Sequence, residues 1–142
     1  VRPGLGDHAS GLAAYEAWAA GLEADADYPA GNAEVLATRT MVHGDQAVML
    51  EERHNAAAYL RAGLALLPEA GEALAAAAAH YERAAGEMDA IWLWGADMGP
   101  RVGRALVSAD TRRSIARHIR LARDAEATAV EHLERALRAA GR

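Results

Sequence analysis

Glu51 and His54 form the one pair of residues in this sequence whose spacing directly indicates metal chemistry. The Glu-x-x-His spacing places a carboxylate and an imidazole one helical turn apart on the same face. Di-iron helical bundles use this spacing, but they need a second such pair and two further glutamates. Because the sequence has no second pair, it predicts at most a single divalent metal ion, completed by Glu87 or Glu126. In the alternative, Glu51 is solvated and His54 only packs or hydrogen-bonds at a helix interface.

The remaining histidines add little to this metal site. His43 lies about 16 Å from His54 by helical rise, which is too far for both to bind one ion. His118 and His132 are flanked by Arg or Glu and are predicted at the surface. His80 belongs to a different predicted helix and could approach either His43 or His54.

The segment from residue 32 to residue 67 carries polar residues on its predicted buried stripe. Steps of three and four residues give an aliphatic seam that is interrupted by polar residues, namely Arg39, His43, Gln46, Arg53 and His54. Buried polar groups need partners inside the fold, so the seam predicts a ligand-binding site. The predicted ligand-binding residues are Trp18, Arg39, His43, Arg53, Trp92 and Glu126. Both tryptophans are expected to be largely buried, because an exposed indole would leave an apolar patch.

Glu126 is the one carboxylate on the inward stripe of the last predicted helix. An unpaired buried carboxylate would bind a proton or cost several kcal/mol, so a cationic partner is expected. Arg53 is preferred over Arg39 and His43, because a guanidinium can hold a carboxylate through two parallel hydrogen bonds. The pair would serve either a binding site or only the register of two helices.

The composition restricts the fold that positions these residues. Hydrophobic residues make up 52% of the 142 residues, with an excess of Ala and no Phe. Good helix formers dominate, while β-branched and aromatic residues are sparse, which predicts an all-α fold. The absence of Cys excludes disulfides and thiol chemistry. With no apolar run near the ~20 residues of a membrane span and no signal peptide, a cytoplasmic location is expected.

Helical periodicity predicts an antiparallel four-helix bundle. A kink or a break is expected at Gly44, and a short extra helix is expected between residues 101 and 107. Residues 1–8 are predicted to be a linker, and residues 9–142 a single domain. The long helices are predicted from Asp7 or Ser10 to Glu23, from Asn32 to Leu67, from Glu69 to Trp94, and from Ser108 or Asp110 to Arg138.

The net charge of −5 is unevenly distributed along the chain. Residues 1–71 carry four Arg and ten acidic residues, whereas residues 72–142 carry eleven Arg and ten acidic residues. A run of arginines between Arg101 and Arg123 could meet phosphate, but it has no interleaved aromatic residues. We therefore expect these arginines to pair with the acidic first half or with a partner protein, and nucleic-acid binding is disfavoured.

Three stretches of the chain carry a family resemblance. They are Ala14–Trp18, Arg53 together with Ala56–Arg61, and Ala122–Ala127 together with Glu131–Glu134. In these stretches the chain resembles a helical domain of uncharacterised bacterial proteins, which sometimes lies beside a papain-like domain similar to the butirosin-biosynthesis acyltransferase. The resemblance implies an accessory or ligand-binding domain. It transfers no catalytic residue, because the chain has no cysteine.

Three functional hypotheses follow from the sequence. The favoured one is a helical bundle that binds a small molecule in a polar and aromatic central pocket. The second is a metal-dependent enzyme with an incomplete ferritin-like site at Glu51 and His54. The third is a protein-interaction or homodimerisation module, and the start at Val1 adds a neighbouring domain as an expected partner. No motif specifies a substrate or settles whether the protein is an enzyme.

Overall fold

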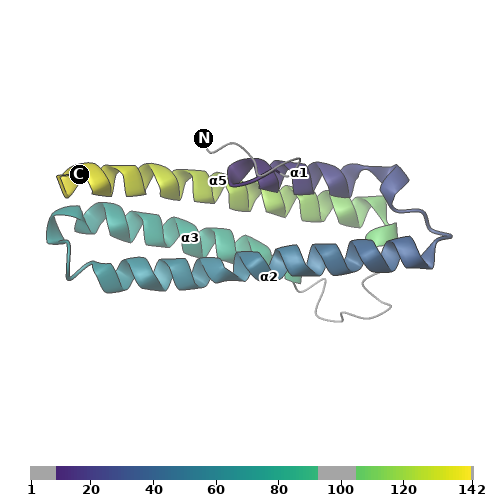
Figure 1. Cartoon of the computed structure of the whole chain (residues 1–142), viewed down its shortest axis with the longest axis horizontal. Coiled ribbons are helices and arrows are strands. Elements are labelled where there is room, and N and C mark those ends of the chain that lie inside the picture. Colours follow the sequence, from purple (N-terminus) through teal and green to yellow (C-terminus); the bar gives the residue numbers. More distant parts are fainter. Residues whose placement is uncertain (1–8, 93–104, 142) are drawn as a thin grey trace.

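The computed structural model describes residues 9–92 and 105–141, except for the side chains of residues 49–51 and 92. Long helices run antiparallel along one elongated bundle, as Figure 1 shows, which confirms the predicted fold class. Residues 105–107 form the described part of a short helix before the last long one. The elements are α1 (Leu12–Glu23), the 3₁₀ turn η1 (Asp25–Asp27), α2 (Ala33–Gly63), the 3₁₀ turn η2 (Pro68–Ala70), α3 (Gly71–Trp92) and α5 (Ala109–Ala139).

Side-chain caps begin two of the helices where the sequence predicts. The Asn32 side chain accepts a hydrogen bond from the backbone N–H of Val35 at 3.1 Å, and α2 starts there. Ser108 caps α5 in the same way. Helix α1 differs, because Gly11 occupies its N-cap position with φ 60° and no side-chain hydrogen bond. The predicted cap at Ser10 is therefore wrong, and the alternative Asp7 lies outside the described residues.

The predicted break at Gly44 does not occur, because α2 continues through this residue as one helix. A glycine inside a helix costs only about 1 kcal/mol relative to alanine, which packing on both sides can offset. Gly44 is itself buried in the bundle. Helix α2 ends at Gly63, earlier than predicted, because the chain turns before Pro68 opens η2.

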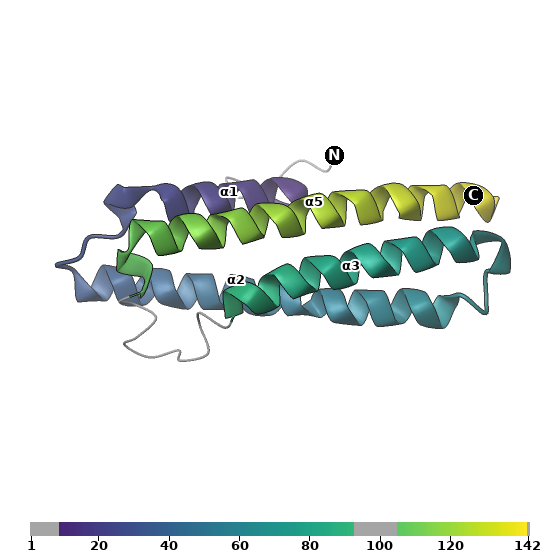
Figure 2. The ribbon, with the colours of Figure 1, turned by 180° about the vertical axis from the view of Figure 1, so that it is seen from behind.

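The long helices of the bundle do not all contact their neighbours to the same extent. Helix α5 lies along both α1 and α3, and α3 lies along α2, whereas α1 and α2 make few backbone contacts with each other. Figure 2 shows that α1 covers only the first part of the much longer α5. At the end that holds α1, the described bundle is formed by α1, α2 and α5, and α3 overlaps α1 only near the middle of the bundle (Figures 1 and 2). Among the described helices, none combines the length and apolar composition that a bilayer span requires.

Ion pairs between α1 and α5 confirm that the arginines of the second half pair with the acidic first half. Arg120 binds both Glu16 and Glu23, and Arg123 binds Glu16. The hydrogen bond from Arg120 lowers the pKa of each of these two carboxyl groups. Because these side chains are partly exposed, they define the position of α1 along α5 more than they add stability.

Arg112 belongs to the same run of arginines and also pairs with the acidic first half, but it is buried, with only 2% of the residue exposed. Its Nε donates to the carbonyl of Leu22 at the end of α1 at 2.8 Å. Its Nη1 donates to the carbonyls of Leu106 and Val107 at 2.7 and 2.9 Å, and its Nη2 pairs with Asp25. One guanidinium therefore joins the end of α1 to the chain that leads into α5.

Replacing Arg112 should destabilise the bundle far more than replacing its neighbour. Arg112→Gln leaves buried carbonyl groups without a donor, and we expect the free energy of unfolding to fall by about 3 kcal/mol. The control is Arg113→Gln, because Arg113 is exposed and pairs only with Asp110 within its own helix; it should change little. Urea unfolding of both variants measures the difference, and equal losses would contradict the structural role of Arg112.

Candidate functional site

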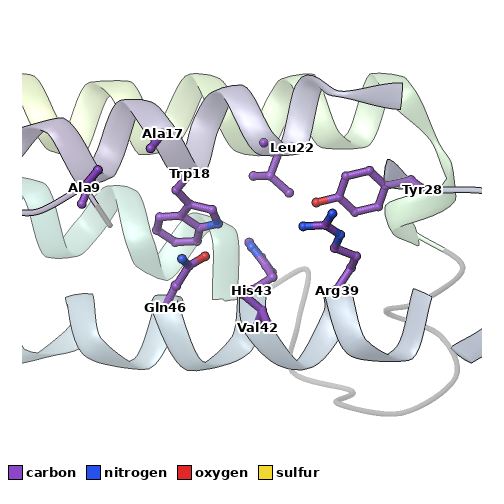
Figure 3. Close-up of a pocket in the computed structure, with 11 residues that line it drawn as sticks. Ala9, Ala17, Trp18, Leu22, Tyr28, Arg39, Val42, His43 and Gln46 are labelled. Atoms are coloured by element: carbon purple, nitrogen blue, oxygen red, sulfur yellow. The ribbon is translucent and has the colours of Figure 1, made fainter. Parts of the chain in front are cut away.

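A cavity of about 450 Å³ lies between α1 and α2, on the side of the bundle where these helices stand apart. Figure 3 shows the indole of Trp18 projecting from α1 toward Gln46 and His43, which project from α2. Arg39 and Tyr28 line the same cavity. Its volume falls in the range of small-molecule sites, which is roughly 300–1,000 Å³.

Two buried nitrogen atoms of this cavity have no hydrogen-bond partner among the described residues. They are Nε1 of Trp18 and Nδ1 of His43, whose rings lie 5.4 Å apart between centroids and at 50°. Leaving a buried polar group without a partner costs about 1–3 kcal/mol, so such groups are rare in folded proteins. Both nitrogens belong to side chains that line one cavity, whereas the third such nitrogen, His80 Nδ1, lies between α3 and α5.

Burial sets the charge of His43. Only 6% of the residue is exposed, and this burial lowers the pKa of the imidazole to about 4. The side chain is therefore neutral at pH 7, with one nitrogen that donates and one that accepts. His43 offers the cavity hydrogen bonds without a positive charge.

The pKa of His43 predicts a loss of stability in mild acid. Its folded-state pKa of about 4 lies below the ordinary value of 6.5, so between these values the unfolded chain binds a proton that the folded chain excludes. As the pH is lowered from 6.5 to about 4, the free energy of unfolding should decrease by about 3 kcal/mol in total. Denaturant unfolding of the wild type and His43→Gln from pH 7 to pH 4 measures this, because other titrating groups cancel in the difference. Parallel pH profiles would show that His43 is not held neutral.

The far end of the cavity carries a paired charge. Arg39 Nη2 lies 2.8 Å from Asp27 Oδ2, and both side chains are about 40% exposed. The Arg39 guanidinium also lies 5.9 Å from the centroid of the Tyr28 ring, and Figure 3 shows it beside the phenol oxygen. Burial raises the pKa of Tyr28, so its hydroxyl stays protonated. This end of the cavity is polar, but its ion pair is electrically neutral.

The predicted pairing of Glu126 with Arg53 is confirmed. Arg53 Nε donates to Oε2 at 2.8 Å and Nη2 donates to Oε1 at 3.2 Å, which is the two-bond geometry expected of a guanidinium. A third member of this cluster, Tyr15, was not predicted; its hydroxyl donates to Oε2 of Glu126. Burial and the adjacent Glu126 raise the pKa of Tyr15 well above its ordinary value. These three residues do not line the cavity, so Arg53 and Glu126 lie apart from Trp18, Arg39 and His43.

The Arg53–Glu126 pair should show strong energetic coupling. We expect the double variant Arg53→Met/Glu126→Gln to be more stable, by about 1–3 kcal/mol, than the two single losses predict by addition. Each single change leaves a partly buried charge without its partner, and the double change removes both charges. The control cycle uses Arg61 and Glu82, an exposed ion pair between α2 and α3, where coupling should be much weaker. Equal coupling in the two cycles would contradict a special role for Glu126.

The metal hypothesis gains no geometric support. Nε2 of His54 lies 3.6 Å from Asp89 Oδ2 on α3, and both side chains are exposed. The side chain of Glu51 lies outside the described residues. Within the described part of the chain, no group of three or more His, Asp or Glu residues is arranged to hold a metal ion. The contact of 3.6 Å is longer than a hydrogen bond and His54 is exposed, so the alternative of a packed or hydrogen-bonded interface residue is not confirmed either.

Three other histidines pack between α3 and α5, contrary to the sequence-based expectations. His80 stacks on His132, with ring centroids 5.3 Å apart, and so does not approach the histidines of α2. His118 is partly buried and its Nδ1 lies 2.8 Å from Oε2 of Glu87. Charged neighbours in the sequence misled the prediction for His118 and His132, because a residue flanked by charges can still face a neighbouring helix.

The prediction that two tryptophans are largely buried can be compared with the structure only for Trp18. Trp18 is only half-buried, because part of its ring faces the cavity instead of a helix, although its Nε1 is buried. The side chain of Trp92 lies outside the described residues. Sequence reasoning missed Tyr28 as a cavity residue. It placed Gln46 on the buried polar stripe, three residues after His43, but did not include it among the predicted ligand-binding residues.

The chain matches none of the protein-family models, curated proteins or solved structures with which it was compared. The resemblance to a helical domain of bacterial proteins therefore stays a prediction. Function has to be inferred from the cavity and the groups that line it.

Proposed function

We propose that this protein binds a small organic molecule in the cavity between α1 and α2. The observation that carries the proposal is that two residues lining one cavity, Trp18 and His43, each hold a buried nitrogen without a partner among the described residues. A ligand that supplies their hydrogen bonds would relieve an energetic cost that the folded chain bears alone. Aromatic and aliphatic walls with a few placed polar groups are typical of such sites.

The surrounding packing supports a preformed site. Arg120 and Arg112 attach α1 to α5, and α2 packs along α3, so each wall of the cavity is held by a different neighbour. Side-chain contacts between the walls, such as the Trp18–His43 ring contact and the Arg39–Asp27 ion pair, add to these attachments. A site held open in this way binds without the cost of separating packed helices first.

A cavity-filling substitution tests the proposal. Gly21 lines the cavity, and a Cβ built there meets no atom within 4 Å, so Gly21→Leu should occupy the cavity without straining the helix. Gly86→Leu on α3 is the matched control, because Gly86 is also helical, exposed and free of contacts at Cβ. A fragment library is screened by ligand-observed NMR against the wild type. Its hits should bind Gly86→Leu normally and Gly21→Leu at least about tenfold more weakly, a loss of about 1.4 kcal/mol.

Two results would overturn the proposed function. One is a screen in which no fragment binds the wild type. The other is a set of hits that bind Gly21→Leu as tightly as Gly86→Leu, which would place their site elsewhere on the protein.

A further inference from the structure

The hydrogen-bonding groups of the cavity define what a ligand must offer. The indole N–H of Trp18 can only donate, so it requires an acceptor. Nδ1 of His43 donates or accepts according to its tautomer, and the neutral ring can adapt to either partner. The acceptor for Trp18 is therefore the fixed requirement, and a neighbouring donor or acceptor on the ligand can meet His43.

The charges around the cavity are already balanced among the described residues. Arg39 pairs with Asp27 at 2.8 Å, and the nearby Arg112 is occupied by Asp25 and the Leu22 carbonyl. His43 is neutral, as described above. Within the described part of the lining there is neither a spare cation for an anionic ligand nor a spare carboxylate for a cationic one. A charged ligand would lose its hydration without gaining an opposite charge.

The shape of the walls favours a flat ligand. The Trp18 and His43 rings are tilted at 50° to each other, and the aliphatic side chains of Leu22 and Val42 line the same space. A planar ring can lie against an aromatic face or edge while its rim reaches the indole N–H. A flexible chain would lose more conformational entropy on ordering.

We infer that the cavity selects an uncharged, planar ring compound that carries a hydrogen-bond acceptor on its rim, such as a lactam or a related carbonyl heterocycle. The inference rests on the proposed function and names the ligand class of the same site. In the complex, the ring carbonyl accepts from the Trp18 N–H, and the adjacent ring N–H of a lactam donates to His43.

Three probes of similar size test this inference. Quinolin-2-one is an uncharged lactam, 2-naphthoate is an anion, and naphthalene has no polar group. Affinities are measured by NMR titration at pH 7 with the wild type and Trp18→Phe. We expect quinolin-2-one to bind the wild type at least about tenfold more tightly than either other probe, the discrimination that one buried hydrogen bond can supply. It alone should shift the indole N–H resonance of Trp18 strongly downfield.

The Trp18→Phe variant removes the donor and keeps an aromatic wall. It should still bind naphthalene, which shows that the cavity is intact, while the preference for quinolin-2-one falls to within about threefold. Tighter binding of 2-naphthoate, or a preference that survives Trp18→Phe, would overturn the inferred ligand class. If quinolin-2-one fails to bind while fragment hits remain sensitive to Gly21→Leu, the class is wrong and the proposed function stands. If the fragment hits are also insensitive to Gly21→Leu, both are wrong.

Discussion

The close approach of α3 and α5 through alanine side chains is the constraint on which the bundle depends. Ala77 and Ala84 on α3, and Ala122 and Ala129 on α5, are completely buried, and the two helices lie along each other for most of their length. Alanine loses no rotamer entropy on burial and lets helix axes approach closely. The α3–α5 pair then carries α2 on one side and α1 on the other. The separation of α1 and α2 follows from these two attachments, which leaves space for the cavity.

The fold could be predicted because its main signals are local. Apolar periodicity located the long helices, and the side chains of Asn32 and Ser108 marked two starts correctly. The errors arose where packing competes with local preference. Gly44 stays helical because its cost of about 1 kcal/mol is small beside the packing of a 31-residue helix. The burial of Arg112 was not predicted, because a run of arginines does not reveal which one meets carbonyl groups of another helix.

For the candidate site, the sequence could predict which face of α2 carries the polar residues, but not which of them lie together. The stripe of α2 correctly placed Arg39 and His43 on one wall and indicated that Arg53 would meet Glu126. It could not show that these residues divide into two sites. Arg53 follows His43 by ten residues, about 15 Å along the helix, and periodicity carries no information on where the short α1 ends beside α2. Tyr15 joins the Arg53–Glu126 pair through that tertiary arrangement, which no spacing in the sequence encodes.

The two polar clusters differ in whether their hydrogen-bonding groups already have partners within the protein. In the cluster of Tyr15, Arg53 and Glu126, the carboxylate receives three donated hydrogen bonds, so a ligand has little to add and any disturbance is costly. In the cavity, Trp18 and His43 each hold a buried nitrogen without a partner. A group in that state is less stable than it would be with a partner, and a ligand that supplies the missing bond gains that difference on binding. The same helices thus carry two clusters with different roles. The hydrogen bonds around Glu126 are satisfied and hold the register of the helices, whereas the cavity keeps unpartnered nitrogens that a ligand can bind.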